Sequence, residues 1–184
     1  MNSTVIINIL RFILLLALQV IVFNRLDLFG FLNPYPYILF ILLFPVNGNR
    51  AVLLISSFFM GLLVDMFLNT GGPHATAAVT LAYLRPTFFK FSFGVSYEYQ
   101  TIKINDRLSP ERFSFILISV ITHHFILFLL EVFRFSLILT TLLHTLYTTL
   151  FTLAICIITI YLIKPGKQQW EKYYCPPLLL PLHY

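Results

Sequence analysis

The chain has 184 residues, of which 59% are hydrophobic and 10% are charged, with a formal net charge of +5. Soluble domains carry about 25% charged residues, so this composition, with a mean hydropathy of +0.88, excludes an ordinary soluble enzyme and indicates an all-α integral membrane protein. We attribute the basic excess to membrane topology rather than to nucleic-acid binding. The 2 cysteines are too few for a disulfide framework or a metal cluster.

The hydrophobic segments predict about six transmembrane helices in one domain, residues 1–163. The first span, residues 5–23, lacks a signal-peptide cleavage site, so we expect it to stay as an anchor, with Arg11 snorkelling towards its end. The second, residues 37–46, is too short to cross alone and follows Pro34 and Pro36. It is either a short tilted crossing, which we favour, or a hairpin buried in protein.

Four further spans are predicted beyond a tight turn at residues 47–50. They cover residues 51–68, from 74 to beyond 83, 113–133, and part of 137–163. Arg85 could anchor a substrate carboxylate, but more simply it marks the cytoplasmic end of the fourth span, which Pro86 bends. The only substantial polar loop is residues 92–112, and we expect the tail, residues 164–184, to be poorly ordered.

The basic residues predict the orientation of the spans. With six spans both termini lie on one side, which then holds ten of the 12 lysines and arginines: Arg11, Arg50, Arg85, Lys90, Lys103, Arg107, Arg112, Lys164, Lys167 and Lys172. The opposite side keeps Arg25 and Arg134. Since lysine and arginine accumulate in cytoplasmic loops, we expect both termini in the cytoplasm.

Asp65 needs an explanation because an ionisable group inside a span is costly. Ser57, Gly61 and Asp65 recur every four residues and share one small face, which can bring a neighbouring backbone close. Three interpretations stay open: a structural carboxylate that bonds the turn at residues 71–72 or another helix, which we favour, a contact with a partner, or proton or ligand chemistry.

The fifth span carries two histidines and a glutamate. His124 and Glu131 are seven residues apart and nearly on one face, whereas His123 points about 100° away. Adjacent histidines cannot readily share one metal ion, so we predict interhelical hydrogen bonds rather than a metal site. The sequence holds no HExxH, GxGxxG, Walker lysine or GxSxG motif, and we predict neither a cofactor nor catalysis.

Residues 58–86 contain FFMGLLVDMF, NTGGPHA and AYLRP in that order. This stretch resembles the rod shape-determining protein MreD family, whose signature is a Gly-Leu-Leu-x-Asp helix followed by a glycine-containing turn. NPYPY before the second span and HH with LEVF in the fifth are similar to the Bacteroidota branch of that family. The family pattern positions are Gly61, Asp65, Gly71, His74, Arg85, Pro86, His124 and Glu131.

The resemblance implies a non-enzymatic scaffold of the cell-elongation machinery in the bacterial inner membrane. The implied partners, besides membrane lipid, are an MreC-like bitopic protein, a RodA-like polymerase with its penicillin-binding transpeptidase, and an MreB-like filament. It also implies a fold similar to the substrate-binding subunits of energy-coupling-factor transporters. The alternative function is therefore a small-molecule-binding subunit of a vitamin importer, which a buried polar pocket would favour. A membrane hydrolase that uses Asp65 and the histidines is a third, weaker possibility.

Overall fold

The structure, a computed structural model, describes residues 3–26, 33–94, 109–132 and 138–163. Within these residues all regular structure is helical. The elements are α1 (Ser3–Ile21), the 3-10 helix η1 (Phe23–Arg25), α2 (Ile38–Leu42), α3 (Arg50–Leu68), α4 (Pro73–Phe93), α5 (Pro110–Val132) and α6 (Ile138–Ile163). The predicted tail, residues 164–184, and most of the polar loop lie outside the described residues.

Four of these elements are long and apolar enough to cross a membrane, as expected for a multi-pass membrane protein. They are Val5–Arg25, Arg50–Leu68, Pro110–Val132 and Thr141–Leu162. The predicted all-α membrane fold is confirmed at this level.

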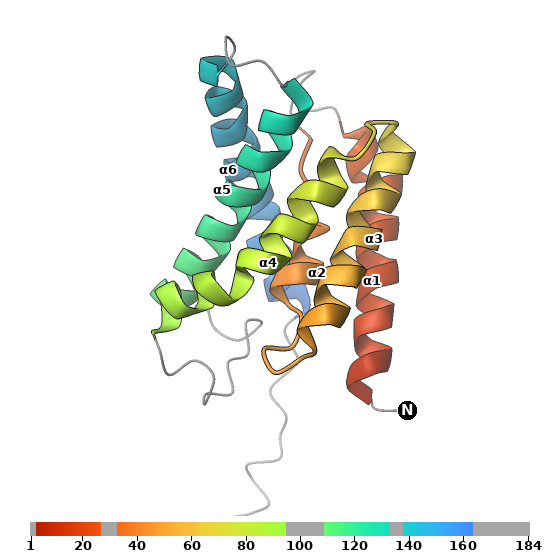
Figure 1. The fold of residues 1–184 in the computed structure, drawn as a ribbon, viewed down its shortest axis with the longest axis vertical. Helices are drawn as coiled ribbons and strands as arrows, with labels where there is room; N and C mark the ends of the chain where they lie inside the picture. Colours follow the sequence, from red (N-terminus) through yellow and green to blue (C-terminus); the bar gives the residue numbers. More distant parts are fainter. Residues whose placement is uncertain (1–2, 27–32, 95–108, 133–137, 164–184) are drawn as a thin grey trace, which may run out of the picture.

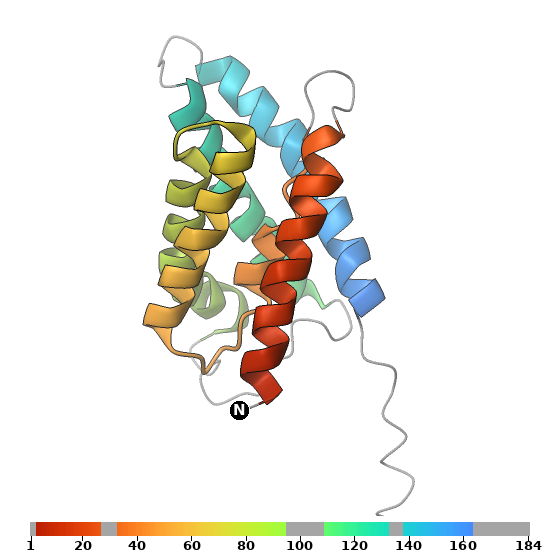
Figure 2. The same cartoon turned by 90° about the vertical axis from the view of Figure 1, so that its right-hand side faces the viewer.

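The long helices form a bundle in which α1, α3 and α5 run in one direction and α4 and α6 in the other (Figure 1). Helix α4 lies between α3 and α5, and α6 packs against α5. The N-terminus lies at the same end of the bundle as the last residues of α6 (Figures 1 and 2).

The second predicted span contains only a short helix. Helix α2 has 5 residues, and Pro34 and Pro36 before it restrict the preceding backbone to extended conformations. Extended chain rises about 3.3 Å per residue against 1.5 Å in a helix, so the segment still runs the height of the bundle, antiparallel to α1 and α3 (Figure 1). Residues 34–42 are all buried, and α2 contacts α1, α3, α4 and α5. Residues 34–42, which we call the central segment, thus fill the middle of the bundle.

Helix α4 is longer than the sequence analysis predicted. Arg85 does not mark its end, because the helix continues to Phe93 with Pro86 inside it. Its 21 residues give a length of about 31 Å, enough for a bilayer core. Four alanines on its inner surface allow the neighbouring helices to approach closely. The buried residues of α4 are His74, Ala75, Ala77, Ala78, Leu81, Ala82, Arg85, Phe88 and Phe89.

Candidate functional site: polar groups inside the helix bundle

Asp65 caps the N-terminus of α4 from the preceding helix. Its Oδ1 accepts hydrogen bonds from Thr70 Oγ1 (2.5 Å) and the His74 backbone N–H (3.1 Å), and its Oδ2 accepts one from the Ala75 N–H (2.8 Å). These are the N–H groups that an N-cap side chain normally satisfies, but the N-cap residue of α4 is Gly72, which has no side chain to do so. Asp65 supplies the missing acceptor.

The turn between α3 and α4 requires unusual backbone conformations. Asn69, Gly71 and Gly72 have φ angles of 57°, 79° and 122°, in the region that glycine and asparagine adopt at least cost. Pro73 then stands at the first helical position, where its missing N–H needs no partner. Gly71 is therefore a turn residue.

The Ser57–Gly61–Asp65 face packs inside the protein. A Cβ on Gly61 would stand 2.5 Å from the Ala75 Cα and from the His74 carbonyl oxygen, so α3 and α4 touch backbone to backbone at this point. Ser57 is fully buried and Asp65 is 3% exposed. The face joins α3 to α4 and offers no surface to another protein.

Two arginines bind the C-terminal end of α2. The Arg85 Nη2 donates to the carbonyl oxygens of Leu42 (3.3 Å) and Phe44, and the Arg11 Nη1 donates to the Leu43 oxygen (2.8 Å). These carbonyls end a short helix and have no helical partner, and a cation is also favourable at that end of the helix dipole. Arg11 therefore bonds inside the protein, where we had expected it to snorkel.

Tyr37 joins two histidines from different helices. Its hydroxyl lies 3.1 Å from His74 Nδ1 and 2.7 Å from His123 Nε2. The hydroxyl has one proton, so it donates to one ring nitrogen and accepts from the N–H of the other. In both arrangements His123 Nδ1 is left without a partner among the described residues. The cluster ties the central segment to α4 and α5.

A second chain of hydrogen bonds has one consistent direction. The Tyr35 N–H donates to Thr152 Oγ1 (3.3 Å), and that hydroxyl lies 3.1 Å from His124 Nε2. His124 Nδ1 lies 2.8 Å from the Val120 carbonyl oxygen, which can only accept, so Nδ1 carries the proton and Nε2 accepts from Thr152. His124 therefore links α5 to α6 and to the central segment.

The predicted site residues do not form a single site. Asp65 and His74 are brought together at the start of α4, Arg85 lies at the other end of α2, and His124 faces α6. Glu131 is exposed near the end of α5, about 10 Å along the helix from His124. Pro86 lies inside α4.

Sequence reasoning gave no role to three residues that hold this core together. Tyr35 and Tyr37 were noted only as part of NPYPY, and Thr152 was not noted. A hydroxyl in a segment too short to be a helical span is the signal that could have found Tyr37, because such a segment must be buried in protein. Gln19 is also fully buried, and its Oε1 accepts from the Tyr37 N–H (3.5 Å).

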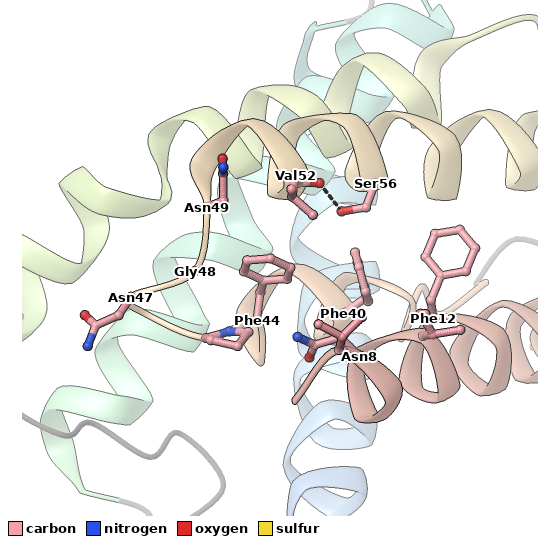
Figure 3. Close-up of a pocket in the computed structure, with 12 residues that line it drawn as sticks. Asn8, Phe12, Phe40, Phe44, Asn47, Gly48, Asn49, Val52 and Ser56 are labelled. Atoms are coloured by element: carbon pink, nitrogen blue, oxygen red, sulfur yellow. Dashed lines mark hydrogen bonds between the residues drawn. The ribbon is translucent and has the colours of Figure 1, made fainter. Parts of the chain in front are cut away.

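A groove of about 630 Å³ lies away from this core, between α1 and α3 (Figure 3). We call it the α1–α3 groove. Its apolar walls are Val5, Ile9 and Phe12 on α1, Val52 on α3, and Phe40 and Phe44 between them. Asn8, Asn47 and Asn49 add amide groups. The groove opens to the outside, because Val5, Ile9 and Val52 are each about half exposed.

The polar groups inside the bundle are arranged to hold the helices together. Each buried ionic group named above bonds backbone groups or another buried side chain, as expected where unpaired polar groups are costly. Within the described residues no three His, Cys, Asp or Glu side chains are grouped to hold a metal ion.

No protein-family model, curated protein or solved structure matches this chain. The resemblance to the MreD family and to energy-coupling-factor subunits stays a prediction from short motifs.

Proposed function

We propose that this chain is a non-enzymatic membrane scaffold of the MreD family that acts in the cell-elongation complex. One observation carries the choice of a scaffold over an importer subunit: the middle of the bundle is filled by the chain itself. Tyr37, Ile38 and Leu39 are 0% exposed, and α2 is enclosed by four other helices. An importer subunit needs a polar pocket for its ligand, whereas a scaffold does not.

The hydrogen bonds of the buried ionic groups also support a scaffold over an importer subunit. Asp65 accepts three hydrogen bonds through its side chain, and Arg85 binds the end of α2. Groups engaged in this way stabilise helix packing. What remains for partners is the outer surface, which is apolar on α1, α3 and α6. Its large exposed side chains include Leu10, Leu14, Ile55, Phe59, Leu146 and Leu150.

The proposed topology has six crossings with both termini in the cytoplasm. The central segment counts as the second crossing, since non-helical backbone is tolerated at membrane depth where protein surrounds it. Topology reporters fused at Gly48 and after Lys164 should both give cytoplasmic signals. A periplasmic signal at Gly48 would remove the second crossing or invert the orientation.

The function is tested by purifying the tagged full-length chain from its own membranes and identifying the bound proteins by mass spectrometry. We expect an MreC-like bitopic protein with a RodA-like polymerase and its transpeptidase, and rounded cells on depletion. Helix association in membranes depends on close packing, so tryptophan at exposed Leu10 should reduce partner recovery at normal abundance if α1 is the interface, and tryptophan at Leu146 if α6 is. Recovery of an ATPase module, or a co-purified vitamin-sized ligand, would favour the importer subunit instead.

A further inference from the structure

We propose that the α1–α3 groove binds an acyl chain of an anionic membrane phospholipid, with the headgroup at the end of the bundle where the N-terminus lies. The inference concerns a different part of the molecule from the polar core, and it does not depend on the proposed scaffold function. Figure 3 shows the groove between α1 and α3, with Phe44 and the turn that carries Asn47 and Asn49 at one end.

The size of the groove fits part of a lipid better than a partner helix. Its volume of about 630 Å³ is within the range of small-molecule sites. Its residues on α1 extend from Val5 to Phe12, about 10 Å, and those on α3 extend from Val52 to Ser56, about 6 Å. Neither stretch exceeds roughly a third of a hydrocarbon core of about 30 Å. A transmembrane helix would need a contact along most of that thickness, whereas an acyl chain occupies one leaflet.

The chemistry of the groove changes from its walls to its end. The accessible part of the walls is mostly aliphatic, because Val5, Ile9 and Val52 are about half exposed, and the buried rings of Phe40 and Phe44 close the groove behind them. The amides of Asn8 and Asn47 provide donors for ester or phosphate oxygens. A mostly apolar groove with a few amide groups along it matches an amphiphile.

The charge of this end of the bundle matches an anionic headgroup. Helix α3 begins with Arg50, α4 carries Lys90 in its last turn, and α5 carries Arg112 beside Glu111 in its first turn. Arg50, which is exposed, directly follows Asn49 of the groove. At the other end the described charges are Arg25, Glu131 and the buried Asp65.

The headgroup, and not the acyl chain, must provide most of the selectivity of the groove for one phospholipid over another. A lipid tail is as well solvated by the bilayer as by the groove, so its burial gives no hydrophobic gain. A basic residue near a membrane surface attracts an anionic lipid strongly enough for about a fivefold preference. We therefore expect phosphatidylglycerol to be retained over phosphatidylcholine.

The test uses the full-length chain in mixed micelles that contain equal amounts of phosphatidylglycerol and phosphatidylcholine, with retained lipid counted by native mass spectrometry. Val52→Trp should fill the groove and remove the retained phosphatidylglycerol. Ile55→Trp is the matched control, because Ile55 is similarly exposed on the same helix (58% against 52%) and does not line the groove. If Val52→Trp does not accumulate, Val52→Phe narrows the same groove with a smaller change.

Equal lipid retention by Val52→Trp and Ile55→Trp would overturn the proposal. So would unchanged lipid in Val52→Trp together with loss of a co-purified membrane protein, which would assign the groove to a partner helix.

The headgroup is tested separately at the exposed Arg50. Arg50→Gln should lower the preference for phosphatidylglycerol about fivefold, and Arg50→Lys should keep it. Arg25→Gln, at the opposite end of the bundle, is the control. An unchanged preference in Arg50→Gln would contradict the assignment of the headgroup to this end.

Discussion

Helices α1 and α4 differ in how much of their surface is buried in the bundle, and their hydropathy alone would suggest the opposite order. Helix α1 is part of the most apolar of the candidate spans, yet only 11% of that window is buried in the protein. Helix α4 is not among those candidates, although its small residues and His74 and Arg85 are buried on both sides against α3 and α5. The apolar helix is at the edge of the bundle and the less apolar one is inside it.

The comparison shows that the hydropathy of a helix reflects how much of its surface faces lipid. It does not show whether the helix belongs to the bundle. A helix that touches lipid must be apolar on its surface. A helix surrounded by other helices needs small side chains for close packing and partners for its polar groups. The same argument covers the central segment, which is hidden by four helices and has a five-residue α2 in place of a full helix.

The largest expected effect is at the contact of α3 with α4. Gly61→Leu should lower the free energy of unfolding by more than about 3 kcal/mol and reduce the amount of protein in the membrane, because even its Cβ would overlap the Ala75 backbone. Thermal unfolding in detergent and immunoblotting of membranes measure the two effects. Met66→Leu, at a 70% exposed position of the same helix, is the control and should be neutral. Normal stability of Gly61→Leu would mean that the two helices are farther apart than described.

The cap of α4 should give the next largest effect. Asp65→Leu leaves the N–H groups of His74 and Ala75 unpaired, at a cost of about 1–3 kcal/mol for each unsatisfied group. Asp65→Asn keeps one acceptor oxygen and should cost about 1–2 kcal/mol. The ratio of the two effects is measured by thermal unfolding of the purified variants. Equal and complete loss of function at normal abundance in both would instead indicate proton chemistry at Asp65.

A smaller effect is expected where the central segment meets α4 and α5. Tyr37→Phe keeps the ring but removes the hydroxyl that bonds His74 and His123, and interhelical hydrogen bonds of this kind contribute about 1 kcal/mol in membranes. The loss should be non-additive with His123→Phe, since both changes remove the same bond. Additive losses in a double-mutant cycle would show that the hydroxyl and the ring do not interact.

Local patterns in the sequence predicted helix α3 and the start of α4. They did not predict the hydrogen bonds inside the bundle. Residues 51–68 were predicted as one span because a turn of glycine, asparagine and proline follows them, and α3 is Arg50–Leu68. The end of α4 was predicted too early, because a buried arginine bound to carbonyls looks in sequence like one that reaches the membrane surface. The bond between Tyr37 and His123 joins residues 86 positions apart, and no local pattern encodes such a distance.

The smallest effect is expected on the outer face of α1. Leu14 and Leu15 are neighbours of identical type, but Leu14 is 58% exposed and Leu15 is 4% exposed. Leu15→Ala should cost about 2 kcal/mol or more because it opens a cavity, whereas Leu14→Ala should stay within about 0.5 kcal/mol because its side chain gains nothing by leaving lipid. Thermal unfolding of both variants in the same detergent gives the comparison.

Partner recovery from native membranes then shows whether the exposed face of α1 contacts lipid or another protein. If Leu14→Ala is as stable as the parent chain and recovers partners normally, that face of α1 contacts lipid. If its stability is normal and recovery falls, the face is an interface that the isolated chain leaves uncovered. A large loss of stability for Leu14→Ala would show that α1 is more deeply packed than α4, and would reverse the comparison.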